Sequence, residues 1–60
     1  MTNRDIKYVA EGVKQIYNEK GYDEGRRAAD QAIAEIIRSG RCDDEAKSDF
    51  RYYSGFSWEE

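Results

Sequence analysis

The stretch from Asp23 to Gly40 constrains the fold more than any other part of the chain. Alanine and isoleucine recur there in two neighbouring rows at a spacing of four residues, and polar side chains take the other half of the helix circumference. The rows are Ala28, Ala32, Ile36 and Ala29, Ile33, Ile37. Asp23 can cap the start by accepting a backbone N–H, and Gly40 can end the helix in the left-handed conformation. The pattern predicts an amphipathic helix over residues 23–39.

A second apolar stripe precedes this helix. Its residues recur at spacings of three and four, which is the seam of a helical hairpin: Ile6, Val9, Val13, Ile16 and the stem of Lys20. Thr2 or Asn3 can cap the start, and Gly21 suits the end. We therefore expect a helix over residues 3–20. The connection to the next helix is so short that the two helices must lie antiparallel.

A third, shorter helix is predicted over residues 44–54. Acidic side chains gather before and within its first turn, where the backbone N–H groups and the helix dipole favour negative charge. Ala46, Phe50 and Tyr53 then share one face, and Gly55 is a natural stop. Residues 56–60 remain as an extended aromatic tail. The prediction is one small all-α domain over residues 1–60: an antiparallel hairpin, a short third helix and the tail.

The apolar content is small for an independent domain. The 60 residues include no leucine and seven branched aliphatic side chains. A core of this size predicts marginal stability alone, and favours a homodimer or folding against a partner. The single cysteine excludes an internal disulfide, and no apolar run is long enough for a signal sequence or a membrane span. These features favour a cytoplasmic protein.

The residue types of common catalytic and metal sites are largely missing. The chain has no histidine, so it lacks the usual general base and the commonest metal ligand. Cys42 has Arg41 beside it but no accompanying base. The acids near residue 45 do not have the alternating spacing of a calcium loop, and no glycine-rich phosphate loop is present. We expect a non-enzymatic protein without cofactor or metal.

Charge is divided unevenly along the chain. Residues 1–41 carry eight basic and seven acidic side chains, for a net charge of +1, whereas residues 42–60 carry two basic and six acidic ones, for −4. A helix-turn-helix formed by the second and third helices would bring Asp43, Asp44, Glu45 and Asp49 towards the phosphates of DNA. This distribution argues against direct nucleic-acid binding and favours a protein partner with a basic surface.

Aromatic side chains are concentrated near the carboxyl end. Five of the eight lie within nine residues: Phe50, Tyr52, Tyr53, Phe56 and Trp58. One interpretation is that Phe50, Tyr53 and Trp58 complete the small core. The other is that exposed rings contact a partner, since Tyr and Trp dominate protein–protein hot spots. Tyr52 and Tyr8 point away from the apolar faces of their helices, so the predicted partner-binding residues are Asp43, Asp44, Glu45, Asp49, Tyr52, Trp58 and Tyr8.

In its size, acidity, lack of histidine and proline, and absence of catalytic residues, the chain resembles the small phage-encoded inhibitors of the anti-CRISPR type. This resemblance implies a stoichiometric inhibitor whose carboxylates (Asp43, Asp44, Glu45 and Asp49) occupy a basic nucleic-acid channel of a nucleic-acid-processing complex. The alternative hypothesis is a dimerising regulatory or assembly protein. A third is a small DNA-binding regulator.

Overall fold

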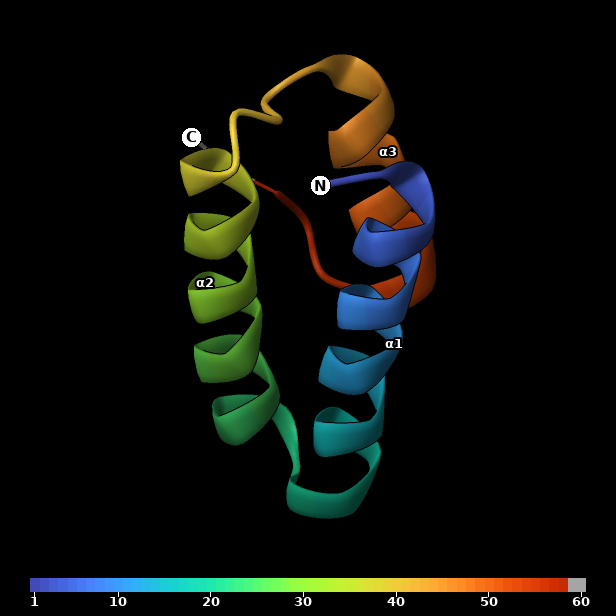
Figure 1. Ribbon diagram of the computed structural model, residues 1–60. Helices are drawn as coiled ribbons and strands as arrows, with labels where there is room; N and C mark the ends of the chain where they lie inside the picture. The colour runs from blue at the N-terminus through green and yellow to red at the C-terminus, as the bar shows by residue number, and fades with distance from the viewer. Residues whose placement is uncertain (59–60) are drawn as a thin grey trace.

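Residues 1–58 of the protein form three α-helices and, after them, a short segment without regular secondary structure. A computed structural model describes residues 1–58 and contains α1 (Asn3–Lys20), α2 (Tyr22–Arg38) and α3 (Asp44–Ser54) (Figure 1). No strand is present in this part of the chain. The predicted all-α class is confirmed, and the bounds agree with the predicted helices to within one residue.

The amino end of α1 is closed by a capping box. Asp5 N donates to Thr2 Oγ1 at 3.2 Å, and Thr2 N donates to Asp5 Oδ2 at 3.1 Å, so two backbone groups that the helix leaves over are satisfied. The backbone N–H and the hydroxyl of Thr2 that bond to the Asp5 carboxylate lower its pKa. Thr2 is thus the cap, and Asn3 is already the first helical residue.

The prediction that Asp23 caps α2 is wrong. The helix begins one residue earlier, at Tyr22, and its N-cap is Gly21, which supplies no side-chain hydrogen bond. Gly21 alone separates α1 from α2 and has φ 95°, a backbone conformation that favours glycine. Because one residue makes the whole reversal, no non-helical position remains for Asp23, which lies in the first turn.

The other end of α2 follows the sequence-based expectation. Gly40 has φ 95°, its N–H donates to Ile37 O at 2.9 Å, and Arg41 N donates to Ile36 O at 3.2 Å. These two bonds form a Schellman-type ending in which the left-handed glycine satisfies carbonyls of the last turn.

α1 is the central element of the structure. It packs against α2, which confirms the hairpin, and also against α3. In Figure 1, α2 stands beside α1, and α3 overlaps the upper part of α1. The buried core takes side chains from all three helices and from the last segment: Ile6, Ala10, Val13, Ala29, Ala32, Ile33, Ile36, Ala46, Phe50, Phe56 and Trp58. Val9 and Ile16 of the predicted α1 seam are only half-buried.

Residues 55–58, which we call the C-terminal segment, pack into the core. Gly55 ends α3 with φ 80°, and the segment then crosses the space between α1 and α2 (Figure 1). Phe56 and Trp58 are only 6% and 8% exposed. For these rings, the core interpretation of the aromatic tail is therefore the correct one. Glu59 and Glu60 of the predicted tail lie outside the described residues.

Gly25 of α2 marks the closest approach of three elements. A Cβ at this position would lie 2.8 Å from Tyr17 Cβ, 3.1 Å from Tyr17 Cα and 3.0 Å from Phe56 Cζ. The absence of a side chain thus allows α1, α2 and the C-terminal segment to meet.

Within residues 1–58, none of the helices has the length and apolar character that crossing a bilayer requires.

Candidate functional site

Asp43, the first of the predicted contact acids, makes hydrogen bonds within the structure. Its Oδ2 accepts from Ala46 N at 3.3 Å and so caps α3. Arg41 donates to both of its oxygens, from Nε at 2.8 Å and from Nη2 at 3.2 Å. The Arg41 hydrogen bonds hold the pKa of Asp43 well below its usual range, and Asp43 in turn raises the pKa of Arg41. This carboxylate is a structural group rather than a free contact.

Arg41 also connects the amino ends of α1 and α3. Its Nη1 donates to the carbonyl of Met1 at 2.7 Å, and its Nη2 donates to Asn3 Oδ1 at 2.8 Å. One half-buried guanidinium therefore links the start of α1 to the start of α3. Sequence reasoning missed this role, because nothing in the local pattern around Arg41 points to residues about forty positions away.

The other predicted acids lie along α3. Asp44 and Glu45 are exposed and Asp49 is half-buried. Glu45, Asp49 and Tyr52 are spaced at i, i+4 and i+7, so they form one stripe on the helix surface. Tyr52 is 80% exposed, and its ring meets Tyr53 edge-on with centroids 4.9 Å apart. Three of the predicted partner-binding residues thus lie on one face of α3.

A hollow of about 630 Å³ lies beside this stripe, and we call it the α3 hollow. It brings together three of the predicted contact residues, Asp44, Tyr52 and Trp58. It also contains four residues that sequence reasoning missed: Lys47, Ser48, Arg51 and Ser57. The i, i+4 spacing of Asp44 with Ser48 and of Lys47 with Arg51 was the available signal. Tyr8 does not line it, although it is 78% exposed on α1.

Trp58 forms the buried wall of the α3 hollow. Its ring meets Phe50 edge-to-face, with centroids 6.0 Å apart and planes at 88°. Trp58, one of the predicted partner-binding residues, is thus 8% exposed and lines the hollow. The indole Nε1 is buried and has no hydrogen-bond acceptor among the described residues. A buried donor without a partner is rare in native structures and costly.

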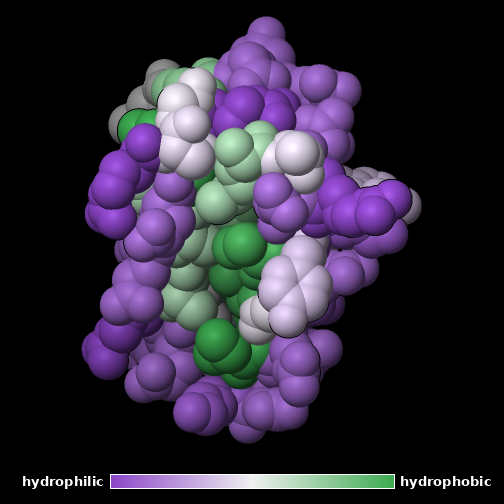
Figure 2. Space-filling view, viewed as in Figure 1, coloured by the Kyte–Doolittle hydropathy of each residue, from purple (hydrophilic) through white to green (hydrophobic). Residues whose placement is uncertain are grey.

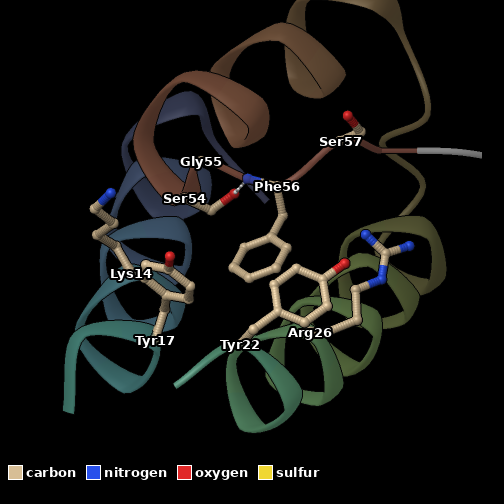
Figure 3. Close-up of a pocket in the computed structure, with 8 residues that line it drawn as sticks. All are labelled: Lys14, Tyr17, Tyr22, Arg26, Ser54, Gly55, Phe56 and Ser57. Atoms are coloured by element: carbon tan, nitrogen blue, oxygen red, sulfur yellow. Dashed lines mark hydrogen bonds between the residues drawn. The ribbon is translucent and has the colours of Figure 1, made fainter. Parts of the chain in front are cut away.

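A second hollow, of about 590 Å³, lies where α1, the start of α2 and the C-terminal segment meet (Figure 3). We call it the Phe56 pocket. The Phe56 ring lies between Tyr17, at 5.7 Å between centroids, and Tyr22, at 5.6 Å. The complete lining is Lys14, Tyr17, Tyr22, Arg26, Ser54, Gly55, Phe56 and Ser57. None of these was predicted as a site residue, because the pocket depends on where the C-terminal segment packs.

The comparisons with known protein families, curated proteins and solved structures find no match for this chain. The function therefore has to be argued from the surfaces of the molecule itself.

A third hollow, the α1–α2 groove, is more apolar than the α3 hollow and the Phe56 pocket. Figure 2 shows hydrophobic side chains gathered between the two helices. The groove has a volume of about 490 Å³ and Gly12 lies in it, with no atom within 4 Å of where its Cβ would be. The other lining residues are Val9, Val13, Ile16, Ala28, Gln31, Ala32, Ala34, Glu35 and Arg38.

Among the described residues, no three acidic or cysteine side chains come together in a way that could hold a metal ion. Cys42, the single cysteine, is exposed. The surfaces that remain are the α3 hollow with its stripe, the Phe56 pocket and the α1–α2 groove.

Proposed function

We propose that the protein is a cytoplasmic, non-enzymatic protein-binding module that uses the outer face of α3. The partner is a protein with a basic surface, and the proposed effect is stoichiometric inhibition by occupying a nucleic-acid-binding site on that surface. The observation that carries the proposal is the placement of the exposed Tyr52 between a row of carboxylates and the α3 hollow.

Tyr52 has the properties of an interface anchor. At 80% exposure it contributes little to the core, and its edge-on contact with Tyr53 limits its motion. The Tyr53 ring is in turn contacted by Lys7, whose Nζ lies 5.3 Å from the ring centroid. A rigid, exposed tyrosine buries a large area on binding at a small cost in conformational entropy.

The charges around Tyr52 support a basic partner. Arg41 holds Asp43 by two hydrogen bonds and pairs more distantly with Glu45, at 4.0 Å. The carboxylates that we propose to meet a partner are therefore Asp44, Glu45 and Asp49. Lys47 and Arg51 stand on the hollow side of the helix. The outer face of α3 therefore combines an acidic stripe with a hollow of mixed charge. Such a charge pattern would favour partners with a complementary one.

The same features agree with the resemblance to small phage-encoded inhibitors of the anti-CRISPR type. Such an inhibitor needs a compact scaffold and a charged surface rather than a catalytic centre. The proposal therefore includes a nucleic-acid-processing complex as the class of target.

The test compares two neutralised variants that change the net charge equally. Asp44→Asn with Glu45→Gln removes the exposed carboxylates of α3, and Glu11→Gln with Glu19→Gln removes two exposed ones from α1. Binding to a purified partner is measured by calorimetry over a range of salt concentrations, together with displacement of nucleic acid from that partner. We expect the α3 variant to bind more weakly and to lose salt dependence, while the α1 variant resembles wild type.

Two results would reject this proposal. One is equal weakening by the two variants, which would show that only net charge matters. The other is a partner that binds the protein and its nucleic acid at the same time. Tyr52→Ala, compared with Tyr8→Ala, then shows whether the contact is centred on α3 or extends to α1.

The α1–α2 groove favours a second candidate function, a regulatory or assembly protein that pairs with a second copy of itself. The groove leaves Val9 and Ile16 half-exposed, and Gly12 allows a second backbone to come close. Sedimentation equilibrium and a melting temperature that rises with protein concentration would support it. A monomer at all concentrations would exclude it.

A further inference from the structure

We propose that the Phe56 pocket binds a small organic anion with an aromatic body, of the class of aromatic phosphate monoesters. This site lies apart from the proposed partner face, with which it shares only Ser57. The inference therefore stands independently of the function proposed for α3.

The first observation is the charge of the pocket. Among the described residues that line it, Lys14 and Arg26 carry positive charge and none is a carboxylate. In a chain with a net charge of −3, a hollow with two cationic groups and no acid is an exception. Opposite charge concentrated in a concave surface attracts an anionic ligand.

The second observation concerns how each cation is held. Arg26 pairs with Asp30 through Nε at 3.4 Å, and Asp30 is not part of the lining. This pair is made through Nε, whereas phosphate binds in a bidentate manner to the forked N–H groups of a guanidinium, which include its terminal nitrogens. Lys14 Nζ lies 5.6 Å from the Tyr17 ring centroid, which keeps the ammonium at the pocket edge.

The third observation is the arrangement of rings and hydroxyls. Figure 3 shows Phe56 between Tyr17 and Tyr22, with the Tyr22 hydroxyl on the side of Arg26 and the Tyr17 hydroxyl on the side of Lys14. Tyr22 is 61% exposed and Tyr17 39%, so both rings offer surface to a ligand. A planar ligand ring can stack there while its anionic group reaches a cation and a phenol donor.

The fourth observation is the size of the pocket. A volume of about 590 Å³ lies within the range of small-molecule sites, roughly 300–1,000 Å³. It holds a monocyclic aromatic phosphate with its bound water.

The probe for the test is phenyl phosphate, followed by ¹H–¹⁵N chemical shifts and calorimetry of the full chain. Phenol tests the need for the anion, and inorganic phosphate tests the need for the ring. Arg26→Gln removes the cation from the pocket. Arg27→Gln is the matched control, because Arg27 is the next residue of α2, is 71% exposed, pairs with Glu24 at 3.8 Å and does not line the pocket.

We expect phenyl phosphate to shift amides near Tyr17, Tyr22 and Phe56 in a saturable manner. Losing a charge-assisted bond should weaken its binding about tenfold in Arg26→Gln, and Arg27→Gln should remain near wild type. Both variants should keep the wild-type helical signal in circular dichroism. Arg27 pairs at an exposed position, and the half-buried Arg26 pairs with the exposed Asp30, so each change removes only one weak ion pair.

Three results would overturn the inference. The first is no saturation up to about 10 mM phenyl phosphate, which is weaker than any specific site of this kind. The second is equal weakening by Arg27→Gln, which would indicate non-specific attraction. The third is equal binding of phenol or of inorganic phosphate, which would remove the need for the anion or for the ring.

Discussion

Substitution of Gly25 by alanine tests the packing on which the whole arrangement depends. The added methyl group would lie 2.8 Å from Tyr17 Cβ and 3.1 Å from Tyr17 Cα. Carbon atoms pack favourably at about 3.5–4.0 Å, so α1 and α2 would have to separate by several tenths of an ångström. The third neighbour, Phe56 Cζ at 3.0 Å, belongs to a buried ring that has little room to move.

The magnitude follows from two opposing terms. Overpacking costs about 1–3 kcal/mol, and the upper end applies here because a backbone atom and a buried ring are the obstacles. The gain in helix propensity from glycine to alanine is at most about 1 kcal/mol. We expect Gly25→Ala to lower the free energy of unfolding by about 2 kcal/mol, which corresponds to a fall of roughly 8–16 °C in Tm for a domain of this size.

Gly12→Ala is the matched control, because the same chemical change occurs in a helix where no atom lies within 4 Å. Only the propensity term remains, so this variant should gain about 1 kcal/mol. Urea unfolding followed by far-ultraviolet circular dichroism measures both. The reasoning would be refuted if Gly25→Ala were as stable as wild type, since α1, α2 and the C-terminal segment would then not meet at this point.

Three further variants test other parts of the structure. Trp58→Phe should change the free energy of unfolding by less than about 1 kcal/mol, because the loss of ring area is offset by the removal of a buried N–H donor that has no acceptor. Trp58→Ala should lower the free energy of unfolding by about 3–5 kcal/mol, and urea unfolding distinguishes the two variants. Asp43→Asn keeps a capping side chain but removes the charge that Arg41 binds. Because the pKa of Asp43 is lower in the folded state than its unfolded value of about 3.9, wild type should lose stability on acidification from about pH 5 to about pH 3, and the variant should lose less. Parallel curves of stability against pH would contradict this. Tyr52→Ala should leave stability within about 0.5 kcal/mol of wild type, because the ring is 80% exposed; a larger loss in thermal unfolding would make it a structural residue.

Helix positions could be predicted because local signals and tertiary packing agree over most of the chain. The apolar rows of α2 and the seam of α1 have the helical period, and the ends at Gly40 and Gly55 depend on a backbone conformation that glycine adopts most easily. The start of α2 was misplaced for a related reason. Asp23 is a good capping residue, but Gly21 alone forms the connection between the helices, so α2 begins at Tyr22 and Asp23 lies inside the first turn rather than at the N-cap.

The candidate sites were predicted less completely. Tyr52 and the acids of α3 could be placed on one surface because they belong to a single helix. The Phe56 pocket could not be predicted, since its walls come from three segments and Phe56 stands in a stretch too short to show a period. The role of Arg41 was missed for the same reason, because its partners Met1 and Asn3 lie at the other end of the chain.

The late position of residues 55–58 in the chain has a consequence for biosynthesis. As the polypeptide leaves the ribosome, the hairpin and α3 are complete before Phe56 and Trp58 emerge, yet these two rings fill the space between them. Until then the nascent chain exposes apolar surface that chaperones and proteases can recognise. A variant truncated after residue 54 would lack both rings, so we expect it to be degraded although each of the three helices is intact in sequence.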